Sequence, residues 1–326
     1  SFMVYPYSGI NGGMVIISAD DPGMHSSQNE QDNRYFAKYA KVPLLEPSDG
    51  NEAKILIKEA FEISERFSTP VLFRTTTSIA HTRCAIETGE RKETAKKTPV
   101  KNFDNFVVPI NAKKLRPKLE DKFLLLKYFS NGFKFNSVEI KGTNIGIIAN
   151  GVSYQYAKEV FPEASFLKLT MSFPFPDKLV KDFCAKHKTV YIIEEGEPFI
   201  EEQTRILGIT NVIGKDKLSN MGELFPDVIE SALLNKDSVK DFSKEIDILP
   251  RPPMMCPGCP HRGVFQALKR LKLYVTGDIG CYIMGSLPPF SAMHTVFCMG
   301  ASIGNAEGLS KSGTNQKYAA VIGDST

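Results

Sequence analysis

Short β-branched runs alternate with segments of helical period along this chain, and this alternation constrains the fold more than any other feature. Residues 14–19 and 71–74 are strand-like, and residues 53–67 between them repeat apolar side chains every three or four positions. Residues 144–149 and 189–194 are strand-like again, and a helical pattern follows each of them. Strands that alternate with helices form parallel sheets covered by helices. The sequence therefore predicts a multi-domain α/β protein.

Two features suggest where the domains divide. Residues 87–141 are the least regular stretch, and their charged part, ERKETAKKTPVKN, breaks the apolar period, so we expect a linker and then a solvent-facing segment. Prolines at 250–253 mark another boundary. A length of 326 residues fits two or three domains. We expect four parts, at residues 1–98, 99–141 (the linker), 142–246 and 247–326.

Composition excludes several classes of protein. The chain has 40 Lys and Arg against 37 Asp and Glu, and this near balance gives no reason to expect nucleic acid or a membrane surface as a partner. No apolar run approaches the roughly 18 residues that span a bilayer, and no signal-peptide pattern opens the chain. Six cysteines in such a sequence indicate reduced thiols or metal ligands in a cytoplasmic protein, with Cys84 and Cys184 as ordinary buried thiols.

The most specific motif is CPGCPHR, Cys256 to Arg262. Two cysteines three positions apart in a tight Pro/Gly turn can converge on one metal ion. The turn precedes a helix predicted at 264–271, whose first backbone N–H groups favour an anion, and His261 and Arg262 can reinforce them. A proline-rich turn with two buried thiols is the alternative interpretation.

Three further motifs follow in the last part of the chain. Residues 276–282 predict a strand end and a small-residue loop, and residues 298–306 predict a helix of small residues. Residues 320–326 predict a buried strand that ends in Gly323-Asp324, which places a carboxylate at the edge where α/β proteins bind ligands and where Mg²⁺ finds a hard oxygen. His294 as a structural histidine and Gly-Asp as a plain turn are the alternatives.

The order and spacing of these four motifs resemble the 2-oxoacid:ferredoxin oxidoreductase family, nearest to the alpha subunit of its indolepyruvate type. ADDPGMHSSQNEQDNR, at residues 19–34, is similar to the pyrimidine-binding domain of that family. GVSYQYAKEV and YIIEEGEPFIEEQ resemble its transketolase-C-like domain. The resemblance implies that 1–98 is the C-terminal part of a pyrimidine-binding domain, 142–246 the transketolase-C-like domain and 247–326 the N-terminal part of a diphosphate-binding domain.

The resemblance also implies a thiamine diphosphate site. Asp324 would be the Mg²⁺ ligand, and Ser325 departs from the glycine that is usual at its position. The implied cofactor-binding residues are Gly258, Cys259, His261, Gly280, Cys281, Tyr282, His294, Met299, Gly300, Gly323, Asp324 and Ser325.

Family members hold an iron–sulfur cluster near the thiamine. Cys256, Cys259 and Cys281 match three of its ligands, and the fourth ligand of a [4Fe–4S] cluster is not visible in this sequence. The resemblance therefore leaves open whether the three thiolates bind a cluster.

The residue that the resemblance places opposite the substrate is His25. The alternative is that Asp20, Asp21, Asn29 and Arg34 only pin its loop. The chain starts and stops abruptly, so we expect residues missing before Ser1, where the activating glutamate of the family would lie, and a domain that continues after Thr326, towards a ferredoxin-like tail.

The implied activity is oxidative decarboxylation of an arylpyruvate to an aryl-acetyl-CoA, with coenzyme A and ferredoxin as co-substrates. The implied partners are a smaller beta subunit and a second alpha chain, in a dimer or heterotetramer. We expect this piece alone to be inactive, and the sequence does not identify the preferred arylpyruvate. A non-redox thiamine diphosphate decarboxylase and a metal-binding interaction module with Cys256, Cys259 and His261 as ligands are the competing hypotheses.

Overall fold

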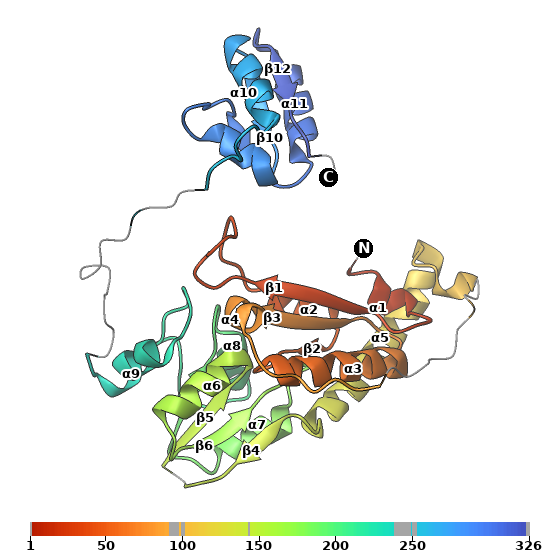
Figure 1. The fold of residues 1–326 in the computed structure, drawn as a ribbon. Helices are drawn as coiled ribbons and strands as arrows, with labels where there is room; N and C mark the ends of the chain where they lie inside the picture. Colours follow the sequence, from red (N-terminus) through yellow and green to blue (C-terminus); the bar gives the residue numbers. More distant parts are fainter. Residues whose placement is uncertain are drawn as a thin grey trace. The chain divides into compact units, whose positions relative to one another are not determined.

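The computed structural model describes residues 2–90, 98, 102–142, 144–237, 249 and 253–323. Its contacts divide the chain into two compact units, Ser1–Lys240 and Asp241–Thr326, each with its own core. Helices, parallel sheets and loops are drawn in chain order in Figure 1. The α/β class, with mostly parallel sheets covered by helices, is confirmed. The boundaries of the four predicted parts stay predictions.

The first sheet of unit 1 has the order β1-β3-β2-β7. Its three parallel strands are β1 (Val15–Asp20), β3 (Val71–Thr76) and β2 (Leu44–Leu45). The crossover helix α3 (Gly50–Phe67) begins where the Asp49 carboxylate accepts the backbone N–H of Glu52, because aspartate is a favoured residue at a helix N-cap. Its buried stripe packs on this sheet. The other helices here are α1 (Tyr5–Ser8), α2 (Arg34–Ala40) and α4 (Thr77–His81).

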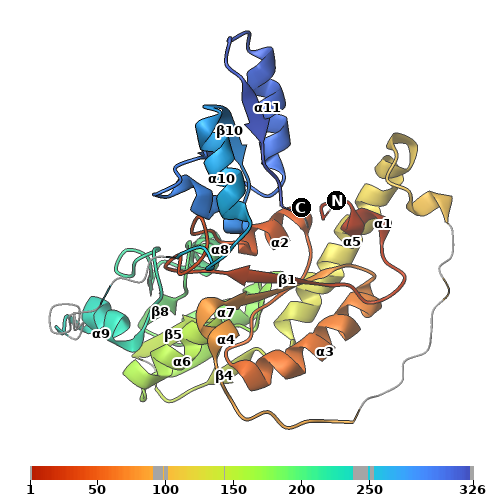
Figure 2. The same cartoon turned by 45° about the horizontal axis from the view of Figure 1, so that its top comes forward.

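The second sheet of unit 1 has the order β4-β6-β5-β8-β9. Figure 2 shows β5 and β8 beside each other with α6 along them. The strands are β4 (Ser137–Glu139), β5 (Ile145–Ala149), β6 (Ser165–Lys168), β8 (Thr189–Ile193) and β9 (Val212–Ile213), of which β4 alone is antiparallel to its neighbour. The helices are α6 (Gly151–Val160), α7 (Asp177–Cys184), α8 (Phe199–Ile206) and α9 (Pro226–Leu234).

The two sheets of unit 1 share a strand partner and a core. β7 (Met171–Phe173) belongs to the second half of the unit but pairs antiparallel with β2 of the first sheet. One hydrophobic cluster combines Leu44 and Leu72 of the first sheet with Ile148 and Val190 of the second. These two parts are therefore packed as one body.

The segment expected at 99–141 is exposed along much of its length, but it is helical rather than irregular. The structure has a helix of 23 residues there, α5 (Pro109–Asn131), after a short 3₁₀ turn η1 (Phe103–Asn105). Leu115, Leu119 and Leu126 are buried at helical spacing, and Figure 2 shows α5 beside α1. The stripe is hard to see in the sequence, because charged side chains flank Leu115 and Leu119 and the exposed Leu124 and Leu125 precede Leu126. Residues 91–97 and 99–101 of the predicted linker lie outside the described residues.

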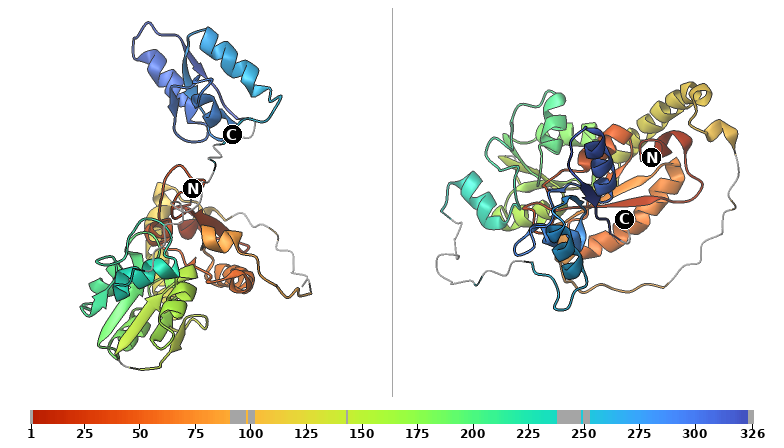
Figure 3. Two further views of the ribbon diagram at one scale, coloured as in Figure 1. Left: turned by 60° about the vertical axis from the view of Figure 1, so that its left-hand side comes forward. Right: turned by 90° about the horizontal axis from the view of Figure 1, so that it is seen from above.

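Unit 2 contains a three-stranded parallel sheet of order β11-β10-β12. Figure 3 shows, in its left view, a helix on either side of these strands. The elements are α10 (His261–Arg270), β10 (Tyr274–Gly277), the 3₁₀ helix η3 (Gly280–Ser286), β11 (Thr295–Val296), α11 (Ala301–Lys311) and β12 (Tyr318–Ala320).

The buried strand expected at 320–323 is wrong in its extent and its burial. β12 ends at Ala320, which is exposed, and Ile322 is 37% exposed. Among the described strands, β12 pairs with β10 only, so its outer edge has no neighbour to bury it. In the described part of the chain, every helix is too short or too polar to cross a bilayer.

Candidate functional site

The carboxylate of Asp278 organises the ligand edge of the sheet in unit 2. Asp278 is completely buried and follows the last residue of β10. Its Oδ1 accepts the backbone N–H groups of Ile279 at 2.8 Å and Gly300 at 3.0 Å, and its Oδ2 accepts that of Gly323 at 2.7 Å. Three predicted motifs, which follow β10, β11 and β12, therefore meet at one edge. The sequence analysis did not select Asp278, although it too follows a strand in a Gly-Asp pair.

Two glycines give this edge its shape. Gly280 and Gly300 have φ angles of +75° and +79°, a conformation that side chains with a Cβ rarely adopt. A Cβ on Gly280 would meet nothing within 4 Å, so the backbone lies open there. Gly300 is the residue before the first turn of α11, and a helix start of this kind suits an anion. The first N–H group of the helix, that of Ala301, donates to the carbonyl of Cys298 at 3.1 Å.

The cysteine-rich turn joins the same edge through an aromatic cluster. The backbone N–H of Cys259 donates to the carbonyl of Cys256 at 3.2 Å, and the Cys259 Sγ lies 3.3 Å from Nδ1 of His261. α10 begins at His261, three residues before the predicted start, so this ring lies in the first turn of the helix. The His261 ring packs edge-on against Tyr282 of η3, with centroids 5.1 Å apart. The first and second motifs are therefore in contact.

Two of the predicted cofactor-binding residues, His294 and Met299, are not part of the contacts described above. His294 lies beside the start of β10, where its Nδ1 accepts the N–H of Val275 at 3.0 Å and its ring stacks on Tyr274 at 4.4 Å. These contacts favour the structural alternative for His294. Met299 is 61% exposed and precedes Gly300.

The predicted metal ligands do not assemble in the described part of the chain. No three His, Cys, Asp or Glu side chains among the described residues are placed to hold a metal ion. Cys256, Cys259 and Cys281 are therefore not gathered as shared ligands among the described residues, where Cys256 and Cys281 are exposed and Cys259 is half-buried. Asp324 and Ser325 lie outside the described residues.

Asp278→Ala should loosen this edge locally. Buried N–H groups of Gly300 and Gly323 would lose a charged acceptor, which costs about 1–3 kcal/mol. We expect both amides to exchange hydrogen for deuterium at least about fivefold faster, while amides within α3 of unit 1 keep their rates. Unchanged exchange at both glycines would contradict the organising role of Asp278.

In unit 1, contacts of Asp20 and Asp21 hold the loop after β1 in place, which agrees with the alternative interpretation that these residues pin the loop. The Asp20 carboxylate accepts the N–H of Asn33 at 3.0 Å and the Nε of Arg74 at 2.6 Å. Asp21 accepts the backbone N–H groups of Ser26 and Ser27, both at 2.9 Å, and these bonds contribute to holding the pKa of its carboxyl below the usual range. Asn29, a third residue of that interpretation, donates a side-chain hydrogen bond to Gln31 within the same loop, at 3.3 Å.

His25 extends from this pinned loop. Its side chain is 53% exposed, and its Nε2 lies 2.8 Å from Oε2 of Glu223, whose side chain is 8% exposed. The structure thus gives His25 a carboxylate partner 198 residues away. The sequence analysis did not find Glu223, because no local pattern marks it.

Arg34 is the fourth residue that the alternative interpretation expects to pin the His25 loop. It also connects the two halves of unit 1. Its buried guanidinium donates to Asp32 through Nε at 2.8 and 2.9 Å and forms an ion pair with Glu194 at the end of β8. It also donates to the carbonyls of Glu195 at 2.9 Å and Glu197 at 2.8 Å. The second buried arginine, Arg74, forms its ion pairs within the first half of the unit.

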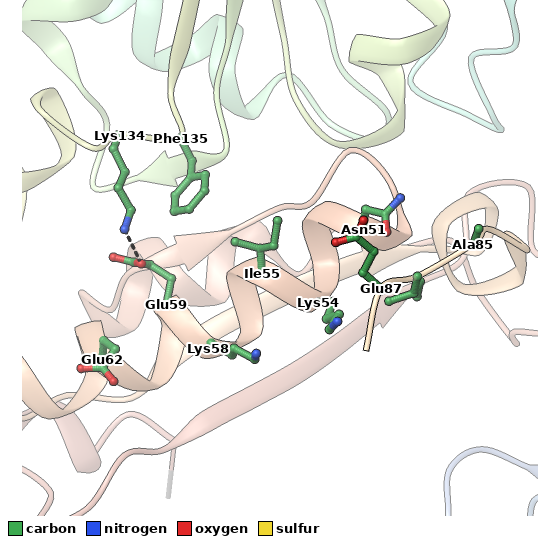
Figure 4. A pocket seen from close by; sticks show the side chains of 11 residues that line it. Asn51, Lys54, Ile55, Lys58, Glu59, Glu62, Ala85, Glu87, Lys134 and Phe135 are labelled. Carbon is green, nitrogen blue, oxygen red and sulfur yellow. Dashed lines mark ion pairs between the residues drawn. The ribbon is translucent and has the colours of Figure 1, made fainter. Parts of the chain in front are cut away.

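A large cavity of unit 1 does not belong to these motifs. It measures about 850 Å³ and lies along the outer face of α3 (Figure 4). Its three lysines face three glutamates, one pair of which, Lys134 and Glu59, is joined at 2.9 Å. Because these charges balance and no reactive group converges there, we assign it no function. The lining residues are Asn51, Lys54, Ile55, Lys58, Glu59, Glu62, Ala85, Ile86, Glu87, Lys134 and Phe135.

Comparison with known proteins finds relatives along the whole chain. The chain is 38% identical to the indolepyruvate oxidoreductase subunit IorA of Methanothermobacter marburgensis, over 100% of this chain and 57% of that protein. It is 35% identical to the protein of the same name from Archaeoglobus fulgidus, over 99% and 56%. The Thermococcus kodakarensis protein of that name is 38% identical, over 100% and 57%. The chain thus spans a little over half the length of these relatives.

No family model matches the chain. Among solved structures, a 2-oxoglutarate:ferredoxin oxidoreductase from Magnetococcus marinus gives a TM-score of 0.48 at 14% identity, over 65% of this chain and 46% of that one. A split-gene transketolase gives 0.40 at 14% identity, over 67% and 61%.

Proposed function

Since the chain belongs to the family of the indolepyruvate oxidoreductase subunit IorA, we propose that the complete protein oxidatively decarboxylates arylpyruvates of the indolepyruvate type. The products are an aryl-acetyl-CoA, CO₂ and reduced ferredoxin, and thiamine diphosphate is the cofactor. The observation that carries this proposal is identity of 35–38% to six proteins of that name, along essentially all of the chain.

The edge gathered by Asp278 supports a diphosphate site there. Open backbone at Gly280 and the N-terminal end of α11 suit an anionic group, and the buried Asp278 holds both segments in place. Thiamine diphosphate would supply the electron sink for loss of CO₂. The residues of this chain would bind and orient it, with His261 and Tyr282 as an aromatic wall and Asp324 as the Mg²⁺ ligand.

The iron–sulfur cluster that passes electrons to ferredoxin is a question separate from the thiamine diphosphate site. Transfer to ferredoxin requires an iron–sulfur cluster in the complete protein, and the arrangement of Cys256, Cys259 and Cys281 does not support a shared cluster on these three thiols. The relatives are named as one subunit of an enzyme, which supports the presence of a second polypeptide. We propose a smaller beta subunit, and two alpha chains in a dimer or heterotetramer.

The test is an anaerobic assay of the complete protein with its partner subunit. We expect ferredoxin reduction and aryl-acetyl-CoA formation from indolepyruvate and phenylpyruvate, dependent on added thiamine diphosphate and coenzyme A. Pyruvate and 2-oxoglutarate serve as control substrates and should react at least about tenfold more slowly, since an arylpyruvate pocket gains its binding energy from the aromatic ring. Release of CO₂ and aldehyde without ferredoxin reduction would favour a non-redox decarboxylase instead.

A further inference from the structure

Three consecutive residues at 222–224 hold together three parts of unit 1. The backbone N–H of Gly222 donates to Oε1 of Glu30 at 2.7 Å, at the far end of the loop that carries His25. The backbone N–H of Leu224 donates to Oε1 of Glu195 at 3.2 Å, just after β8. Both ends of this short segment are therefore fixed, and Glu223 lies between them.

The Glu223 side chain is bound on both of its oxygens. Its Oε2 lies 2.8 Å from Nε2 of His25, and its Oε1 accepts the hydroxyl of Ser78 in α4. The hydroxyl of Tyr156 in α6 donates in turn to Ser78 Oγ at 3.2 Å. The Tyr156 ring packs against Phe225 with centroids 5.7 Å apart. The carboxylate is thus nearly buried and held directly by the His25 loop and by α4, and α6 supports the Ser78 contact.

This contact determines which ring nitrogen of His25 is left free. A carboxylate can only accept hydrogen bonds, so Nε2 of His25 must carry the hydrogen. Nδ1 is then an acceptor in the neutral ring and a donor in the protonated ring. The charged or titratable groups around the pair are Asp21, which pins the same loop, Tyr156, and Glu195, whose pKa is raised by burial.

We propose that Glu223 is the positioning residue that holds His25 as its Nε2–H tautomer and presents Nδ1 to the 2-oxoacid. The inference rests on the proposed function, in which His25 faces the substrate. The same division of roles, a buried carboxylate that orients a histidine whose other nitrogen works, occurs in many enzymes. Glu223 acts through His25 and need not contact the substrate.

The first test reads the tautomer directly and does not depend on activity. The chain has five histidines, so ¹⁵N-histidine labelling gives few signals, and His25→Gln assigns those of His25. We expect shifts of the Nε2–H form in the wild type and a mixture of tautomers in Glu223→Ala. Glu163, an exposed glutamate of the same unit, provides the control as Glu163→Ala. An unchanged His25 signal in Glu223→Ala would overturn the proposal.

The second test measures turnover in the complete enzyme. We expect Glu223→Gln to lower kcat for indolepyruvate about 10- to 100-fold with a smaller change in KM, and Glu223→Asp to restore part of it. His25→Gln should lose as much, and the double variant no more than either single one. If His25→Gln keeps full activity while Glu223→Ala alters the tautomer of His25, the catalytic role of His25 is ruled out, although its contact with Glu223 remains. No arylpyruvate turnover in the wild type would instead count against the proposed function.

Discussion

Asp324→Ala in the complete protein is expected to abolish Mg²⁺-dependent binding of thiamine diphosphate, with a loss of affinity of at least about 100-fold. The carboxylate would be the hard oxygen ligand that bridges protein and diphosphate through the metal ion. The residue before it, Gly323, is tied to Asp278 at 2.7 Å, so the backbone next to position 324 is anchored at the ligand edge.

Calorimetric titration of thiamine diphosphate with and without Mg²⁺ would measure this loss. Glu307→Ala is the matched control, because Glu307 lies in α11 and is paired only at the surface with Lys311. Its affinity should stay within about twofold of the wild type, since an exposed pair contributes little. Thermal melting of Asp324→Ala at the wild-type temperature would show that the fold is intact. Unchanged affinity in that variant would remove the Mg²⁺ assignment.

Arg34→Met is expected to lower the free energy of unfolding of unit 1 by about 3–5 kcal/mol. Arg34 is completely buried between Asp32 and Glu194, and methionine would leave both carboxylates buried without their cation. Urea unfolding would measure the change. Arg205→Met is the control, because its pair with Glu201 joins positions four apart on α8 and Arg205 is 41% exposed. It should cost less than about 1 kcal/mol, and an equal loss in both variants would contradict the argument.

The same cluster predicts how stability depends on pH. Burial raises the pKa of Asp32, but the charges of Arg34 and Arg74 and the hydrogen bonds to Arg34 outweigh it and lower this pKa from 3.8 to about 2. A carboxyl with a lowered pKa stabilises the folded state above its unfolded pKa and loses that contribution as the pH falls through the folded one. Asp32 therefore contributes fully above roughly pH 4 and progressively less towards pH 2. In Arg34→Met this part of the acid dependence should shrink.

Local pattern was sufficient for much of the fold. α3 and β5 lie within a few residues of their predicted ranges, because their periods are strong and cap-type residues or glycines bound them. α5 was missed because charged residues flank Leu115 and Leu119, and Leu126 lies in an apolar run with the exposed Leu124 and Leu125, so only packing shows which side is buried. The pairing of β7 with β2 joins residues more than 120 positions apart, which no local signal can indicate.

The candidate site likewise has residues that the sequence pattern predicts and residues that it does not. Gly280, Gly300 and Gly323 meet because loops after neighbouring parallel strands share an edge, which the sequence pattern predicts. Asp278 and Glu223 were not selected, because both act by accepting hydrogen bonds from distant residues. Their partners are known only once the chain is folded. Whether the predicted residues bind thiamine diphosphate stays a prediction.

The pairing of β7 with β2 also limits how this protein can be divided. Cutting at residue 141 would separate the two strands and leave the N–H and C=O groups of Leu44 and Leu45 open on that side. Such a bare strand invites other chains to pair with it. The half that carries the His25 loop should therefore aggregate when expressed alone, and any shortened version ought to keep residues 171–173.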